Sequence, residues 1–156
     1  MKDIEIRKKI ESLLATQMLA VLSTQKNGQP YVNLIAFAMA DGLETLIFAT
    51  PRATRKYTNL QEESRVSLLV DCRSNQQSDF HKASALTIIG QAKEADQATF
   101  ESYHPIFISH HPYLRDFVLS PTTSLFIVSV KHYIMVSHFQ RVLELHLTDE
   151  TDLFAR

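Results

Sequence analysis

The sequence from residue 48 to residue 56 reads Phe48-Ala49-Thr50-Pro51-Arg52-Ala53-Thr54-Arg55-Lys56. Thr50 followed by Pro51 is typical of a helix start, because the hydroxyl can cap the helix and proline suits the first helical position. We therefore predict a helix that begins at Pro51 and runs to about Ser64. The N–H groups at a helix start lack partners and carry partial positive charge, and three cations and two hydroxyls stand beside them here. These features predict a phosphate-binding site, and a solvated basic helix face is the alternative.

Short apolar runs lead into this motif and are separated by turn sequences. The runs are Met18 to Thr24, Tyr31 to Met39 and Thr45 to Thr50, and Asn27-Gly28 and Asp41-Gly42 lie between them. Asn-Gly and Asp-Gly favour tight hairpins because both residues of each pair accept positive φ angles. The three runs are therefore predicted to form an antiparallel meander.

The rest of the chain continues with short strands and a few helices. Ile6, Ile10, Leu13 and Leu14 recur at helical spacing behind Asp3, a good cap, and predict an amphipathic first helix. The remaining predicted elements are a strand from Val66 to Asp71, a strand from Ala85 to Lys93 with a bulge at Gly90, a short helix capped by Asp96, a second helical stretch between His104-Pro105 and Leu119, strands Ser124 to Val130, Tyr133 to Ser137 and Arg141 to Leu147, and a frayed tail after Thr148.

These elements predict a chain that is mainly β with flanking helices, an α+β fold of seven or eight strands. Small antiparallel sheets of this kind remove their exposed edges by closing into a barrel. A length of 156 residues without a repeat or linker suits a single domain over residues 1–156.

The charge balance argues against nucleic acid and membranes as partners. The chain has 16 Lys and Arg against 17 Asp and Glu, a net charge of −1, so it has no global positive field. Its longest uncharged stretches have 14 residues, too few to span a bilayer. The N-terminus lacks the pattern of a secretory signal, and Cys72 is the single thiol, so we expect a cytoplasmic protein.

The central motif resembles a known family. Phe48-Ala49-Thr50, Thr54-Arg55-Lys56, Asn59-Leu60 and Arg65 to Leu69 are similar to the signature of FMN-binding split-barrel proteins related to pyridoxamine 5'-phosphate oxidase. The order of elements extends this resemblance over roughly residues 4–147. It implies a split antiparallel β-barrel of the FMN-binding type.

The resemblance also implies a set of residues that bind FMN. In the family, the matching segments hold the phosphate and run along the isoalloxazine ring. Carried over to this chain, the phosphate ligands are Thr50, Thr54, Arg55 and Lys56, with Ala49 contributing main chain and Arg52 a possible further cation, and the ring-binding strand is Asn33, Leu34, Ile35 and Ala36.

Departures from the family pattern affect the substrate end. Asn33, Ala38 and Ala85 stand where the vitamin-oxidising members have arginine, lysine and glutamine, and the C-terminal arginine–histidine pair and its tryptophan have no match. The resemblance therefore implies an FMN-dependent oxidoreductase that acts on an unidentified small molecule other than pyridoxamine phosphate. A non-catalytic flavin-binding or sensing module is the alternative, and a cofactor-free interaction scaffold is a third.

Other reactive residues suggest no further chemistry. His104, His110 and His111 lie close in sequence, and imidazole commonly binds zinc, iron and haem. No carboxylate accompanies them at metal spacing, so we expect no dedicated metal site and predict roles in capping and packing. Ser23 and Ser67 lack an acid and base at recognisable spacing, which gives a hydrolytic triad no support.

A homodimer with FMN at the interface is the last expectation. Tyr31 to Met39 and Ser124 to Val130 are apolar on both alternating faces, as expected where one face meets the core and the other a second subunit. Members of the family are similarly dimeric. Strands buried on both faces within one chain would show the same pattern.

Overall fold

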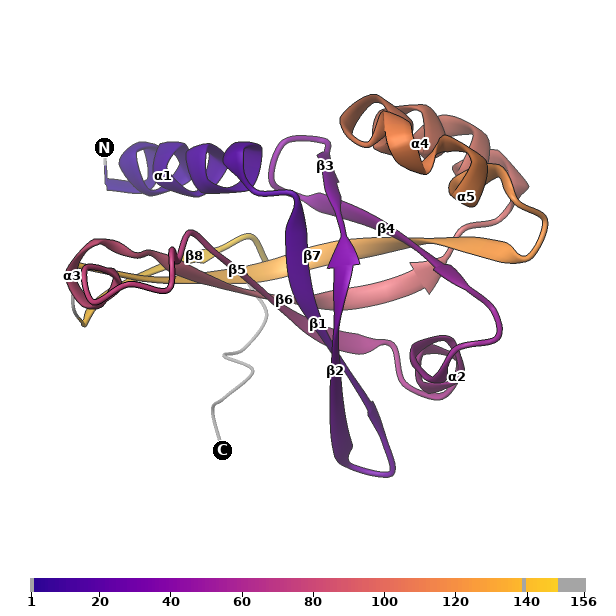
Figure 1. Ribbon diagram of the computed structural model, residues 1–156, viewed down its shortest axis with the longest axis horizontal. Helices are drawn as coiled ribbons and strands as arrows, with labels where there is room; N and C mark the ends of the chain where they lie inside the picture. Colours follow the sequence, from indigo (N-terminus) through magenta and orange to yellow (C-terminus); the bar gives the residue numbers. More distant parts are fainter. Residues whose placement is uncertain (1, 139, 149–156) are drawn as a thin grey trace.

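The computed structural model describes residues 2–138 and 140–148, which fold into a curled antiparallel sheet with helices around it (Figure 1). Within these residues the sheet has eight strands in the order β2-β1-β5-β6-β7-β4-β3, and β8 pairs with β7. The strands are β1 Leu19–Lys26, β2 Gln29–Ala36, β3 Ala38–Ala40, β4 Thr45–Pro51, β5 Arg65–Asp71, β6 Ala85–Glu94, β7 Thr123–Ser137 and β8 Arg141–His146. The helices are α1 Lys2–Thr16, α2 Arg55–Glu62, α3 Asp79–Lys82, α4 Gln97–His110, the 3-10 helix η1 Pro112–Leu114 and α5 Arg115–Leu119. The predicted mainly β fold with flanking helices is confirmed.

Consecutive residues of the chain connect the two ends of this sheet. β2 and β3 lie at opposite ends of the strand order, yet only Phe37 separates them in sequence. The predicted single strand from Tyr31 to Met39 is wrong, because residues up to Ala36 pair with β1 whereas residues from Ala38 pair with β4. This change of partner at Phe37 curls the sheet into a split barrel.

β7 is the strand at which the sheet forks. The pattern predicts two strands, Ser124 to Val130 and Tyr133 to Ser137, but the structure has one strand of 15 residues. β6 pairs along most of it, while β4 pairs with its first half and β8 with its second half. The predicted bulge at Gly90 is confirmed by a register shift between Ile89 and Gly90. A Cβ atom on Gly90 would lie 2.5 Å from the Ser129 carbonyl oxygen, so this close approach requires glycine.

Apolar side chains form two clusters, one within the curled sheet and one between the sheet and α4. Alternate residues of β4 and β7 serve different clusters. Phe48 and Phe126 stack in the first with ring centroids 5.3 Å apart, whereas Ala49 and Leu125 belong to the second together with Phe107. The apolar character on both faces of this part of β7 is therefore explained within one chain.

α1 packs as the sequence predicts. Its apolar residues Ile6, Ile10, Leu13 and Leu14 are buried in the first cluster. Asp3 lies inside the first helical turn, so its predicted role as the cap is wrong. Across residues 2–138 and 140–148, no helix is both long enough and apolar enough to cross a membrane.

α2 begins later than predicted. The helix runs from Arg55 to Glu62 with Thr54 as its N-cap, so the predicted start at Pro51 and end near Ser64 are wrong. Pro51 is the last residue of β4 and pairs with Thr123 of β7. A proline can end an edge strand as well as begin a helix, and here its strand pairing decides.

α4 continues through a predicted break. Asp96 caps it as predicted, because its side chain accepts a hydrogen bond from the Thr99 N–H at 2.8 Å. The helix contains Pro105 in its interior, so the predicted stop there is wrong. Phe107, two residues further, is buried, and this packing offsets the backbone donor that proline removes. The predicted frayed tail, beyond residue 148, lies outside the described residues.

Candidate functional site

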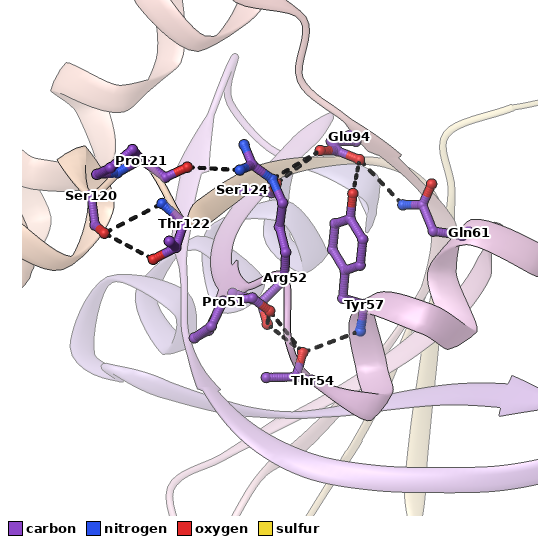
Figure 2. Close-up of polar contacts among 11 residues, drawn as sticks. Pro51, Arg52, Thr54, Tyr57, Gln61, Glu94, Ser120, Pro121, Thr122 and Ser124 are labelled. Carbon is purple, nitrogen blue, oxygen red and sulfur yellow. Dashed lines mark hydrogen bonds and ion pairs between the residues drawn. The ribbon is translucent and has the colours of Figure 1, made fainter.

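Two threonine hydroxyls hold the turn between β4 and α2. The Thr54 hydroxyl donates to the Pro51 carbonyl at 2.9 Å and accepts from the Tyr57 N–H at 3.3 Å (Figure 2). Thr50 is buried, and its hydroxyl lies 3.1 Å from both the Pro51 carbonyl and the Thr54 hydroxyl. These bonds determine where α2 starts. The Tyr57 N–H is satisfied by the Thr54 side chain, whereas the N–H groups of Arg55 and Lys56, the first two residues of the helix, have no acceptor within it.

A hollow of about 730 Å³ lies between this helix start and the β1–β2 hairpin. The Arg55 guanidinium carbon lies 5.7 Å from the centroid of the Tyr31 ring, and both side chains line the hollow. Thr54 and the buried Asn59 also line it. The volume is in the range of small-molecule sites, and the helix start with the exposed Arg55 makes this end positive.

Lys56 follows Arg55 in the first turn of α2 but is less accessible. Its side chain is half-buried, and burial lowers the pKa of its ammonium group. Of the four predicted phosphate ligands, the structure brings Thr54 and Arg55 to the hollow, whereas Thr50 and Lys56 do not line it.

Arg52, the predicted further cation, uses its donors inside the protein (Figure 2). Its Nε atom donates to the Ser124 hydroxyl at 2.8 Å, and Nη1 donates to the Pro121 carbonyl at 2.7 Å. The Glu94 carboxylate lies 4.0 Å from Nε. Arg52 therefore ties the turn to β7 and the loop before it, while its half-exposed side chain also lines the hollow.

Glu94, at the end of β6, is the common acceptor of this network. Its carboxylate accepts from the Ser124 hydroxyl at 2.8 Å, the Tyr57 hydroxyl at 2.9 Å and the Gln61 amide at 3.2 Å. Burial acts to raise the pKa of Glu94, but these hydrogen bonds and the Arg52 charge outweigh it, so the pKa lies below its usual value. The pKa of the Tyr57 hydroxyl is raised, chiefly by the hydrogen bond that this hydroxyl donates to Glu94. An ionised Glu94 therefore fastens α2 to β6 and β7.

The predicted ring-binding strand lies along an open edge of the sheet. Within the described residues β2 pairs only with β1, and β3 covers only residues 45–47 of β4. The outer backbone groups of β2, in the stretch Asn33, Leu34, Ile35 and Ala36, thus have no strand partner. A flat ring with hydrogen-bonding groups can take the place of a neighbouring strand at such an edge.

Asn33 is the polar side chain on the inner face of β2. Side chains alternate along the strand, so Tyr31, Asn33 and Ile35 are partly or fully buried, whereas Val32 and Leu34 are 61% and 63% exposed. The Oδ1 atom of Asn33 is buried and has no hydrogen-bond partner among the described residues. A buried amide oxygen without a donor is unfavourable, and a ligand N–H placed there would satisfy it.

The sequence analysis did not select Tyr31 or Asn59 as site residues. The Nδ2 atom of Asn59 donates to the Thr24 hydroxyl at 3.0 Å, while its buried Oδ1 atom has no partner among the residues that the structure describes. Spacing could have found both residues. Tyr31 is two positions from Asn33 in a strand, and Asn59 is four positions from Arg55 in a helix, so each pair shares a face.

The three neighbouring histidines, His104 and His110 of α4 and His111 just after it, make packing contacts. The Nε2 atom of His111, which is buried, lies 2.6 Å from the Phe37 carbonyl and so joins the end of α4 to the break between β2 and β3. The His104 ring stacks on Phe100 with centroids 4.7 Å apart, and His110 bonds a carbonyl of its own helix. These contacts agree with the predicted packing role.

A curled antiparallel sheet joined end to end through β2 and β3 and forked at β7 defines a split β-barrel protein. This fold is the one that the sequence predicts. Residues 6–135 match the model of the family described as pyridoxamine 5'-phosphate oxidase, and the chain belongs to this family. None of the curated proteins compared with the chain matches it.

Solved structures share the fold at low sequence identity. A heme binding protein from Mycobacterium smegmatis superposes with a TM-score of 0.80 and 13% identity over 90% of this chain, which spans only 57% of that protein. A protein from Clostridium acetobutylicum related to general stress protein 26, of the pyridoxinephosphate oxidase family, gives a TM-score of 0.69 and 16% identity over 93% of this chain and 96% of its own. A FAD-binding protein from Mesorhizobium loti gives 0.67 and 16% over 82% and 91%.

Proposed function

We propose that this protein binds FMN and acts as an FMN-dependent oxidoreductase on a small molecule. The observation that carries the proposal is the positive hollow at the start of α2, where Arg55 lies over Tyr31 beside the open edge of β2. Membership of the pyridoxamine 5'-phosphate oxidase family supports a flavin there, as does the FAD-binding structural neighbour.

The phosphate end is assigned to the first turn of α2. Arg55 and Lys56 supply charge, Thr54 lines the hollow, and the buried Thr50 hydroxyl holds Thr54 in place. The Ala49 main chain completes the set. The unpaired N–H groups of the helix start favour a dianionic phosphate, and each charge-assisted hydrogen bond contributes about 1.5–3 kcal/mol.

The ring end is assigned to the open edge of β2. The main chain from Asn33 to Ala36 offers donors and acceptors without strand partners, and the Asn33 Oδ1 atom offers a buried acceptor. A bound flavin supplies the hydride and electron chemistry, so the protein needs only to bind, orient and shield it. This division of roles is consistent with a site that has no evident acid–base pair.

The substrate differs from pyridoxamine phosphate in this proposal. Ala38, which replaces the family's lysine, is 1% exposed and packs in the cluster under α4. Ala85, which replaces the glutamine, is the first residue of β6 and pairs with Asp71 and Val136. Neither methyl group can bind a charged or hydrogen-bonding substrate, so the substrate must be recognised by other groups.

A homodimer that covers the flavin is part of the proposal. Val32 and Leu34 are exposed on the outer face of β2, and Leu34 pairs with Val21 of β1, beside the 55% exposed Leu19. An apolar sheet face of this kind next to the ring-binding edge suits a second copy of the chain. We expect sedimentation at about twice the 17.8 kDa chain mass. Leu34→Glu should give monomers that lose FMN, whereas Ile4→Glu, on the exposed side of α1, should not.

The visible spectrum of the purified protein tests cofactor binding. We expect a flavin spectrum, with FMN released on denaturation and identified by mass. Titration of the apoprotein should show FMN binding more tightly than riboflavin, which lacks the phosphate. A colourless protein that fails to bind added FMN, or release of FAD or haem, would contradict the proposal.

Turnover distinguishes the enzyme from the alternative, a flavin-binding or sensing module. The flavin-loaded protein is mixed with NADH or NADPH and oxygen, and flavin reduction and sustained oxidation are followed. Bound FMN without sustained turnover with any donor would favour the module.

A cytoplasmic location is the remaining part of the proposal. The single cysteine, Cys72, is exposed with a free thiol, as suits a reducing compartment. Fractionation of the source cells, with a cytosolic enzyme as marker, tests it, and recovery in the secreted fraction would contradict it.

A further inference from the structure

We propose that His132, Glu144 and His146 form a binding site for a divalent first-row transition metal ion. The three residues lie on β7 and β8, in the half of β7 that does not pair with β4. They are different from His104, His110 and His111, which lie in and just after α4, and they do not line the hollow at α2.

Strand register brings the two imidazoles together. His132 and His146 are direct partners in the β7–β8 ladder. The Leu147 N–H donates to the Lys131 carbonyl at 2.9 Å, so the next pair, His132 and His146, is a non-hydrogen-bonded pair, in which facing side chains are closest. Their ring centroids lie 3.8 Å apart. Glu144 stands two residues before His146, so its side chain leaves the sheet on the same face.

The spacing of the ligand atoms suits one small ion. The Glu144 Oε2 atom lies 3.3 Å from Nε2 of His146 and 3.7 Å from Nε2 of His132, and all three ligand atoms lie within 4.8 Å of one another. Tetrahedral ligands at bond lengths of about 2.0–2.1 Å are about 3.3–3.4 Å apart. The two rings stack with 27° between their planes, so the exposed His146 ring must turn out of this stack before both Nε2 atoms can point at one ion.

Burial divides the roles of the three ligands. The His132 side chain is only 5% exposed, whereas Glu144 and His146 are 49% and 47% exposed. The buried imidazole is a fixed ligand, the other two can adjust, and the solvent side leaves room for water as a fourth ligand. Two imidazole nitrogens with one carboxylate favour zinc, nickel or copper over magnesium and calcium, which prefer oxygen ligands.

Zinc binding to the tag-free protein tests the site. The exposed thiol of Cys72 is first removed by Cys72→Ser, because it could bind zinc by itself. Zinc is then titrated in competition with a chromophoric chelator. We expect one ion per chain and a higher melting temperature with zinc. His146→Ala and Glu144→Gln, both at exposed positions, should each weaken binding at least about 10- to 100-fold, since even outer-shell changes cost this much.

Controls separate this site from incidental zinc binding. His110→Ala removes an exposed imidazole on α4 and should leave the zinc affinity unchanged. The copper-loaded protein should show coupling to two nitrogen atoms by electron paramagnetic resonance, reduced to one in His146→Ala. FMN affinity should be the same in His146→Ala and the parent. Absence of one-to-one zinc binding, equal affinity in His146→Ala, or an equal loss in His110→Ala would overturn the proposal.

Discussion

Two arginines three residues apart lie on either side of the start of α2, and they are used differently. Arg52 donates to Ser124 and Pro121 beside Glu94. Arg55 lies over Tyr31 and makes no hydrogen bond or ion pair to the described residues. An arginine whose donors are used inside the protein stabilises the fold, while one that keeps its donors at an open hollow can bind an anion. Their positions relative to the end of β4, rather than their residue type, separate the two roles.

Loss of Arg55, which lines the hollow and makes no hydrogen bond to the described residues, should have the largest effect on FMN binding. Arg55→Ala should weaken FMN binding about 10- to 100-fold, because a charge-assisted hydrogen bond is lost, and Lys56→Ala should weaken it less, because Lys56 does not line the hollow. Arg55 is exposed, so the free energy of unfolding should change by less than about 0.5 kcal/mol in Arg55→Ala. Fluorescence titration with FMN and riboflavin measures the affinities, with Arg141→Ala, at an exposed site in β8, as the control. Unchanged FMN affinity in both variants would remove the assigned phosphate site.

Loss of Arg52, which donates to Ser124 and Pro121, should chiefly lower the stability of the fold. Arg52→Ala loses its bonds to Ser124 and Pro121, and at about 1 kcal/mol each the free energy of unfolding should fall by about 1–2 kcal/mol. The ion pair with Glu94 adds little because the Arg52 side chain is half-exposed. Urea unfolding measures the loss, with Arg55→Ala as the matched control. If Arg52→Ala instead weakened FMN binding as much as Arg55→Ala at unchanged stability, the contrast between the two arginines would be wrong.

The aromatic partner of Arg55 should contribute less. Tyr31→Leu removes the cation–π contact, worth about 0.5–1 kcal/mol at an exposed site, so FMN binding should weaken by about two- to fivefold. Tyr113→Leu, at a fully exposed position, is the control. A loss in Tyr31→Leu as large as that in Arg55→Ala would show that the ring binds the ligand directly.

The pH dependence of stability should show the smallest effect. The pKa of Glu94 is lowered in the folded protein, so its contribution is present above the carboxyl's usual pKa and is lost as pH falls through the folded value. The free energy of unfolding of the parent should therefore fall more between about pH 5 and pH 3 than that of Glu94→Gln. Urea unfolding across this range compares the two proteins, and parallel curves would refute an ionised Glu94 in the network.

Features that depend on residues close together in the sequence could be predicted from the sequence. The Asn27-Gly28 and Asp41-Gly42 turns have positive φ angles at all four residues, as hairpin chemistry requires. The Asp96 cap and the close approach at Gly90 are equally local. The start of α2 was misplaced because Thr50-Pro51 and Thr54 both satisfy the local rule for a helix start, and the pairing of Pro51 with β7 decides between them.

The sequence by itself determined the charged motif at 48–56, the turns between strands and the apolar face of α1, since each depends on residues a few positions apart. Only the tertiary structure decided which arginine donates to other residues of the protein and which keeps its donors available to a ligand. Arg52 reaches Ser124, 72 residues away, and the open edge beside Asn33 arises from the change of partner at Phe37. Strand register sets such contacts, and register depends on how the whole sheet buries its apolar faces, which no local pattern records.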